Sequence, residues 1–181
     1  YDKEFEARKD VSISEYMLMI SKKTAKMLET SAAVGALIGG ADKDFIAVVK
    51  EFALNIGLAF QIQDDLLDIV ADEADFGKKI GGDIVEGKKT YLLLKAYENT
   101  QGSAGHKLLE KIINNNGLKN AGTKEIEEVR EVYEESGAVS CARQEIEKFT
   151  DQAMQCLEKL PDNTGRQRLK WLAEMLMNRK I

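Results

Sequence analysis

"FALNIGLAFQIQDDLLDI", residues 52–69, is apolar on nearly every side until it ends in three carboxylates. Apolar residues around the whole circumference are typical of a central helix that other helices surround. We expect this helix to begin at Asp42 or Lys43 and to run to about Ala71. A helix of this kind needs helical neighbours, so the flanking segments decide the fold class.

Those flanking segments also show helical spacing. Apolar residues recur every three or four positions from Ile13 to Ile38, in a stripe that a serine at 12 or 14 could cap and that a glycine pair ends. In the last helix, Trp171, Leu172 and Met175 are expected on the buried face. The sequence predicts an all-α bundle of long, mostly antiparallel helices, forming one domain over residues 1–181. Further helices are expected over 90–99, 103–115, 124–136, 138–160 and 164–180.

Composition narrows the classes of function. The 181 residues are 44% hydrophobic, which supports one sizeable core, and the net charge of −5 argues against a nucleic-acid partner. No run of eighteen apolar residues occurs, so we expect no membrane span. Cys141 and Cys156 would lie about 22 Å apart on one predicted helix, beyond disulfide reach, which suits a reduced, cytoplasmic protein. The chain opens without Met inside a polar, apparently helical segment, so we expect a fragment whose first helices are missing.

The carboxylates at the end of the central helix are the first candidate site. Asp64 and Asp68 are one turn apart and share a face with Gln61, while Asp65 is rotated by about 100° and still within reach of the same ion. Like charges at this spacing destabilise a helix, and so does negative charge at its C-terminus. A solvated helix end would explain them, but their apolar neighbours favour a bound cation. Oxygen ligands of this kind suit Mg²⁺.

A lysine- and glycine-rich segment, Asp75–Lys89, follows and cannot form a regular helix. Loop lysines often face only solvent, but glycines would let the backbone and the lysines close around an anion. Mg²⁺ normally binds one or two carboxylates together with substrate phosphates. Acids beside lysines therefore predict a metal–diphosphate site. The lysines concerned are Lys78, Lys79, Lys88 and Lys89.

Lys23 and Thr24 give an independent indication. Thr24 interrupts the apolar stripe of the first long helix with a hydroxyl, and Lys23 stands beside it. A tolerated core threonine next to a surface lysine would explain the pair. Antiparallel packing against the central helix could instead bring both near its acidic end, where they would donate to phosphate.

Taken in order, these motifs resemble the C-terminal part of the trans-isoprenyl diphosphate synthases, the polyprenyl synthetase family. The family's second aspartate-rich motif, F-Q-x-x-D-D-x-x-D, is matched by Phe60-Gln61, Asp64-Asp65 and Asp68. The family's helix-borne Lys-Thr is matched by residues 23 and 24. Its G-K-x-x-G-x-D and G-K-x-T motifs are matched by Gly77-Lys78, Gly81, Asp83, Gly87-Lys88 and Thr90.

The resemblance implies an isoprenoid-synthase helical fold and a Mg²⁺-dependent prenyltransferase. Such an enzyme condenses an allylic diphosphate head to tail with isopentenyl diphosphate, usually as a homodimer. It implies that Asp64, Asp65 and Asp68 are catalytic metal ligands. It also implies that the diphosphate is bound by Lys23, Thr24, Gln61, Lys78 and Lys88.

The family's first aspartate-rich motif is absent from this sequence. The resemblance therefore implies the C-terminal portion of a longer synthase, inactive by itself. A non-catalytic helical subunit and a class I terpene cyclase are the alternatives. The intact acids and lysines disfavour the first alternative, and the G-K-x-x-G-x-D and Lys-Thr motifs disfavour the second.

Overall fold

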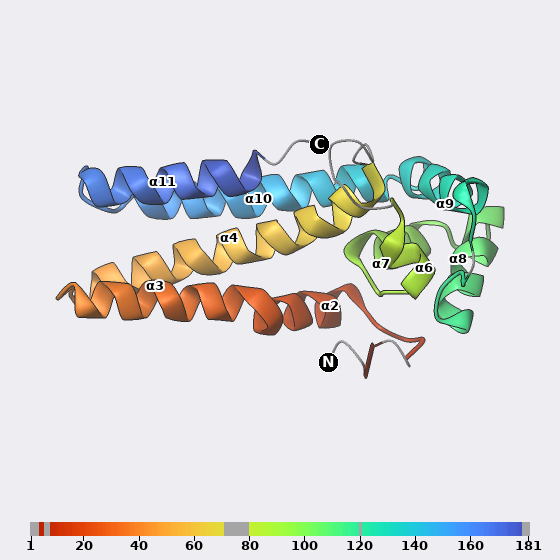
Figure 1. Cartoon of the computed structure of the whole chain (residues 1–181), viewed down its shortest axis with the longest axis horizontal. Helices are drawn as coiled ribbons and strands as arrows, with labels where there is room; N and C mark the ends of the chain where they lie inside the picture. Colours follow the sequence, from red (N-terminus) through yellow and green to blue (C-terminus); the bar gives the residue numbers. More distant parts are fainter. Residues whose placement is uncertain (1–3, 6–7, 71–79, 120, 179–181) are drawn as a thin grey trace. The chain divides into compact units, whose positions relative to one another are not determined.

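The computed structural model describes residues 4–5, 8–70, 80–119 and 121–178. These residues form helices and no strand, which confirms the all-α fold (Figure 1). The backbone divides into two compact units. The first unit comprises Tyr1–Met19, Asp64–Arg143 and Lys180–Ile181, and the second comprises Ile20–Gln63 and Gln144–Arg179. The single domain expected over residues 1–181 stays a prediction.

The helices lie close to where the apolar spacing placed them. Two elements were not anticipated: a π-helical turn, η1, inside the first long helix, and the short helix α6 inside the glycine-rich segment. The elements are α2 (Ile13–Ile20), η1 (Ser21–Ala25), α3 (Lys26–Ile38), α4 (Lys43–Val70), α6 (Gly82–Glu86), α7 (Tyr91–Asn99), α8 (Ala104–Asn115), α9 (Thr123–Glu135), α10 (Ala138–Glu158) and α11 (Thr164–Met177).

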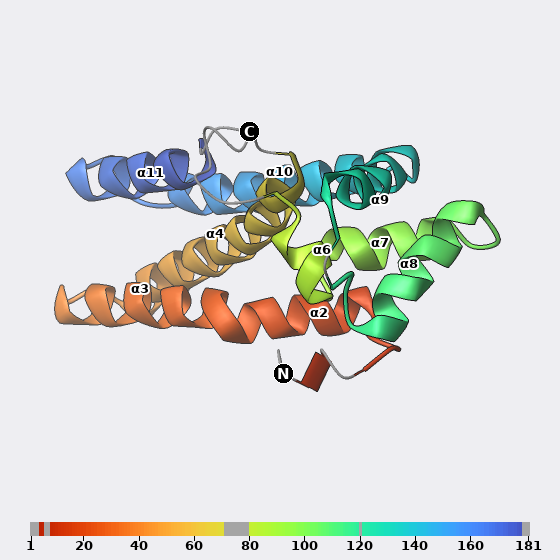
Figure 2. The same ribbon diagram turned by 45° about the vertical axis from the view of Figure 1, so that its right-hand side comes forward.

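The second unit is built from α3, most of α4, most of α10, and α11. In both views α3 runs beside α4, and α10 runs beside α11 (Figures 1 and 2). Apolar side chains of α4, α10 and α11 form a common core, against which α3 packs. The core residues are Val49, Phe52, Ala53 and Ile56 of α4, Ala153, Cys156 and Leu157 of α10, Leu160 just after it, and Ala173 of α11.

A glycine sets how closely α4 approaches the π-helical turn. A Cβ atom placed on Gly57 would lie 2.6 Å from the Cα and 2.8 Å from the Cβ of Ala25, and 3.2 Å from Cδ1 of Leu28. Real Cβ atoms do not come this close to backbone. The two helices can therefore meet here only because residue 57 has no side chain.

The first unit contains α2, the end of α4, and α6 to α9. Ser12 caps α2, as expected, because its Oγ accepts the backbone N–H of Glu15 at 3.2 Å. The Glu15 carboxylate accepts the N–H of Ser12 in return, which completes a capping box. Helices α7, α8 and α9 pack against one another around fully buried side chains, which are Leu92, Leu93, Leu109, Ile112, Val129 and Tyr133.

Two glycines of the first unit bring their backbones into direct contact. Gly87 and Gly117 both have positive φ, 68° and 103°. A Cβ on Gly87 would lie 2.2 Å from the backbone N of Gly117, and a Cβ on Gly117 would lie 2.6 Å from that of Gly87. The turn that precedes Lys88 is thus pressed onto the turn between α8 and α9.

Several large apolar side chains that the sequence placed on buried faces are exposed. In the predicted stripe of α3, the exposed fractions are 65% for Met27 and 82% for Ile38; Leu37, which the stripe did not include, is 66% exposed. On α11, the exposed fractions are 61% for Trp171, 38% for Leu172 and 46% for Met175, so the expectation that these three residues belong to the buried face of that helix is wrong. These residues keep helical spacing, but no described element covers them.

Among the described helices, α4 is long and apolar enough to cross a membrane. Its most apolar 18-residue window has a mean hydropathy of 1.6, and 44% of that window is buried inside the protein. The core helix of a soluble protein meets the same criterion, so this is weak evidence for a span. The expected absence of a membrane span stays a prediction.

Candidate active site

The three carboxylates at the end of α4 lie in three different environments. Asp65 is buried, with 6% of its surface exposed, whereas Asp64 and Asp68 are half-buried. All three occupy the last two turns of the helix. All three are aspartates, but they differ in exposure and in hydrogen-bond partners. They are therefore not interchangeable as metal ligands.

Asp65 is held by hydrogen bonds from two other elements. Its Oδ2 accepts the phenol of Tyr16 in α2 at 2.7 Å and the backbone N–H of Tyr91, the first residue of α7, at 3.2 Å. Burial raises the pKa of the Asp65 carboxyl to about 6, although Lys88 and Tyr16 act in the opposite direction. The desolvation cost of ionising this carboxyl is only partly offset by its partners.

Asp68 joins the end of α4 to the start of α6. Its Oδ2 accepts the backbone N–H of Asp83 at 3.0 Å, and its backbone carbonyl accepts the N–H of Gly81 at 2.8 Å. The first amides of a helix have no partner within it, so a carboxylate there satisfies them. Burial raises the pKa of Asp68, and the nearby Asp83 carboxylate raises it further.

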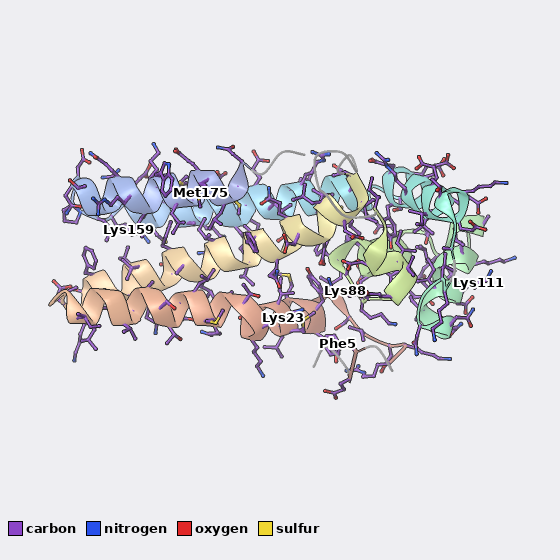
Figure 3. All side chains as sticks on the ribbon, in the orientation of Figure 1. Phe5, Lys23, Lys88, Lys111, Lys159 and Met175 are labelled. Atoms are coloured by element: carbon purple, nitrogen blue, oxygen red, sulfur yellow. The ribbon has the colours of Figure 1, made fainter. Side chains whose placement is uncertain are left out.

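Lys88 brings a positive charge to these acids from the α6–α7 connection (Figure 3). Its Nζ lies 3.0 and 3.1 Å from the two carboxylate oxygens of Asp83 and 3.7 Å from Oδ1 of Asp65. Burial alone would lower the pKa of Lys88, but the charges of Asp65 and Asp83 outweigh it and the pKa is raised. The side chain is 40% exposed. A protonated ammonium is therefore available at the surface beside the acids.

Asp83 is the residue to which sequence reasoning gave no role. It forms the closest ion pair of Lys88, and its backbone amide binds Asp68. The signal was present, because Asp83 is the last position of the G-K-x-x-G-x-D match. Lys89, in contrast, is 3% exposed, and its Nζ donates to the carbonyl of Gly87, so it is directed away from solvent.

The second unit brings together two more of the expected residues. Thr24 Oγ1 donates to Oε1 of Gln61 at 3.1 Å. Thr24 and the exposed Lys23 both lie in the π-helical turn η1 (Figure 3). Turns of this type are often found at functional sites. The Thr24 hydroxyl thus has a polar partner in the protein, and its role as a diphosphate donor stays a prediction.

Two expected features are not placed by the structure. Lys78 and Lys79 lie outside the described residues. In the part of the chain that is described, no three or more His, Cys, Asp or Glu side chains come together as a metal cluster.

Comparison with known proteins identifies the family. The polyprenyl synthetase family model matches residues 1–135. The short chain isoprenyl diphosphate synthase of Methanothermobacter thermautotrophicus is 37% identical over 179 residues, which are 99% of this chain and 53% of that protein. The geranylgeranyl diphosphate synthase of Saccharolobus solfataricus is 35% identical over 181 residues, again 99% and 53%. The chain spans about half the length of the curated relatives it matches.

Solved structures that resemble this chain are also prenyl synthases. The crystal structure of geranylgeranyl pyrophosphate synthetase from Pyrococcus horikoshii superposes with a TM-score of 0.88 at 34% identity, covering 99% of this chain and 53% of that one. A polyprenyl synthase from Caulobacter crescentus, complexed with calcium and isoprenyl diphosphate, gives 0.86 at 28% identity, with 99% and 54% covered. The acidic end of α4, the helical fold and these matches agree, and the chain belongs to the polyprenyl synthetase family.

Proposed function

We propose that this chain is the C-terminal part of a Mg²⁺-dependent isoprenyl diphosphate synthase. The enzyme would join an allylic diphosphate head to tail to isopentenyl diphosphate and release a longer prenyl diphosphate. The observation that carries the proposal is the end of α4, where acids that suit a metal lie beside a protonated lysine. The matched relatives are named as synthases of this kind.

Asp64 and Asp68 are the residues that would hold Mg²⁺. Their oxygen-only donor set fits this ion, and the Caulobacter relative contains both a divalent cation and an isoprenyl diphosphate. Bound Mg²⁺ would neutralise charge that develops on the departing diphosphate. Lys88 would donate to the same diphosphate, with Asp83 keeping its ammonium protonated and oriented. Further diphosphate donors, proposed from the motif match, are Lys23, Thr24, Gln61 and Lys78.

The chain's own residues would act through charge and position. The C–O bond of the allylic substrate breaks as its diphosphate leaves, so stabilising that leaving group lowers the barrier. The isopentenyl double bond then attacks the allylic cation, and a proton is lost to complete the new double bond. We further propose that the complete enzyme is a cytoplasmic homodimer without a membrane span and without a nucleic-acid partner.

Calorimetric titration tests the diphosphate site on this chain. We expect inorganic pyrophosphate to bind in the presence of Mg²⁺ and not when EDTA replaces it. Asp64→Asn should weaken that binding by about tenfold or more, because it removes a charged oxygen ligand. Asp44→Asn is the matched control, since Asp44 is exposed in the first turn of the same helix. Equal affinities for the two variants would refute the metal assignment.

A product assay tests the reaction. Incubated with geranyl diphosphate, labelled isopentenyl diphosphate and Mg²⁺, this chain should give no longer prenyl diphosphate, because the family's first aspartate-rich motif is not in it. A synthase that carries this chain as its C-terminal half should give product, and Asp64→Ala should lower its kcat by about a hundredfold. Product from the 181-residue chain alone would show that the missing motif is dispensable.

A further inference from the structure

The partners of Asp65 distinguish it from the other two carboxylates of α4. Its Oδ2 accepts two hydrogen bonds, from the Tyr16 phenol and the Tyr91 backbone N–H, and its other oxygen faces Lys88. The residue is 6% exposed, so a ligand would reach it only by displacing these groups. The resemblance assigned all three acids to the metal. The structure gives Asp65 protein partners on both oxygens instead.

The geometry points to Asp65 as a positioning residue and not a metal ligand. It ties α2 and the start of α7 to the end of α4, and in doing so holds Lys88 where the diphosphate would bind. This inference rests on the proposed function, because it assigns a role within the same site. It also adds Tyr16, to which the family motifs give no part.

The first step of the argument is the start of α7. Thr90 is its N-cap, and the Thr90 side chain accepts the N–H of Leu93. The N–H of Tyr91, the first residue of the helix, donates to the Asp65 carboxylate. A carboxylate is favourable at a helix N-terminus, where the partial charge is positive. Asp65 thus completes the cap that Thr90 leaves unfinished.

The second step is Tyr16, which is 1% exposed. A buried hydroxyl needs a partner, and Asp65 supplies it at 2.7 Å. The rings of Tyr16 and Tyr91 also meet edge to face, with centroids 6.1 Å apart and an interplanar angle of 64°. If Asp65 turned toward a metal, the Tyr16 phenol and the Tyr91 amide would both lose their acceptor inside the core.

The third step connects this junction to Lys88. The N–H of Thr90 donates to the carbonyl of Lys88 at 2.9 Å, so fixing the first residues of α7 also fixes the backbone of Lys88. The Lys88 ammonium then lies 3.7 Å from Oδ1 of Asp65 and 3.0 Å from Asp83. Asp65 therefore acts on the diphosphate through Lys88, by fixing the backbone that carries its side chain.

A conservative substitution separates the two roles. A metal ligand needs the negative charge, whereas a positioning residue needs the hydrogen-bond acceptor, which asparagine keeps. We expect Asp65→Asn to lower the affinity of this chain for Mg²⁺–pyrophosphate by no more than about threefold. Asp65→Ala should lower it by about tenfold, because two buried donors lose their partner. An Asp65→Asn loss equal to that of Asp64→Asn would overturn the proposal.

Tyr16→Phe gives the second test. It removes the phenol and leaves the carboxylate, so it should weaken Mg²⁺–pyrophosphate binding only if Asp65 acts through position. Added to Asp65→Ala it should cause no further loss, because both changes break the same contact. Full affinity in Tyr16→Phe, or additive losses in the pair, would contradict the inference.

Hydrogen exchange tests whether Asp65 positions the start of α7, even if pyrophosphate does not bind. Absence of binding to the unsubstituted chain would refute the proposed function. The Tyr91 amide would still report on the junction. It should exchange about tenfold faster in Asp65→Ala and at a nearly unchanged rate in Asp65→Asn. Equal protection of Tyr91 in both variants would show that Asp65 does not position α7. Should Asp65→Ala fail to fold, the Tyr16→Phe and Asp65→Asn comparison decides alone.

Discussion

Replacement of Gly57 by alanine should destabilise the protein, although alanine is ordinarily the better helix residue. The added methyl would lie 2.6 Å from the Cα of Ala25, and backbone cannot rotate out of the way as a side-chain tip can. Helix α4 and the π-helical turn would have to separate. Gly35 offers a matched control, because it lies inside α3 with nothing within 4 Å of the position its Cβ would take.

The two substitutions should change stability in opposite directions. Overpacking costs about 1–3 kcal/mol, and the helix preference for alanine over glycine returns about 0.5–1 kcal/mol. Gly57→Ala should therefore lose up to about 2.5 kcal/mol net, which lowers Tm by up to about 10 °C in a chain of this size. Gly35→Ala meets no obstacle and should gain about 0.4–1 kcal/mol.

Thermal unfolding followed by far-ultraviolet circular dichroism measures both variants. The reasoning would be refuted if Gly57→Ala melted at or above the temperature of Gly35→Ala. Adding Ala25→Gly to Gly57→Ala should restore only part of the loss, because the Cα of residue 25 remains in place. Full recovery would mean that the Ala25 methyl, and not the backbone, is the obstacle.

The pH dependence of Asp65 and the exposed face of α3 give two further predictions. Burial raises the folded-state pKa of Asp65 from 3.8 to about 6, so between these values the unfolded chain releases a proton that the folded chain keeps. The free energy of unfolding of the unsubstituted chain should therefore fall relative to that of Asp65→Asn as pH rises from about 4 to 6, and then level off. Urea unfolding of both proteins measures this, and a difference between them that does not change with pH would contradict the raised pKa. Leu37 and Ile38 are 66% and 82% exposed, so this chain should self-associate at micromolar concentration. Replacing both with lysine should reduce that association in sedimentation velocity, and an unchanged distribution would exclude α3 as the contact.

The periodicity of apolar residues was enough to predict most helices. Their spacing follows from the 3.6-residue turn of the α-helix. The π-helical turn at Ser21–Ala25 escaped prediction because it changes the backbone hydrogen-bond register without a distinct residue type. The exposure of Ile38 and Trp171 escaped it for another reason. Spacing tells which residues share a face, and it does not tell whether another element covers that face.

In the candidate site, too, some features could be predicted from the sequence and others could not. The acidic motif located the end of α4, and the match to G-K-x-T located Lys88 beside it. The different environments of Asp64 and Asp65 could not be predicted, because burial of Asp65 depends on Tyr16 and Tyr91, which are remote in the sequence. The sequence left two interpretations of Thr24 open, and neither included its hydrogen bond to Gln61, which depends on how the π-helical turn η1 packs on α4.

The contact between Gly87 and Gly117 limits how this sequence can evolve. A side chain at either glycine would clash with the backbone of the other. Because glycine is already the smallest residue, no substitution at one position can make room for a side chain at the other. A side chain at either position should therefore destabilise the fold. A library that varies the residues around this turn should keep glycine fixed at 87 and 117. Substitutions introduced at those two codons are expected to give destabilised chains.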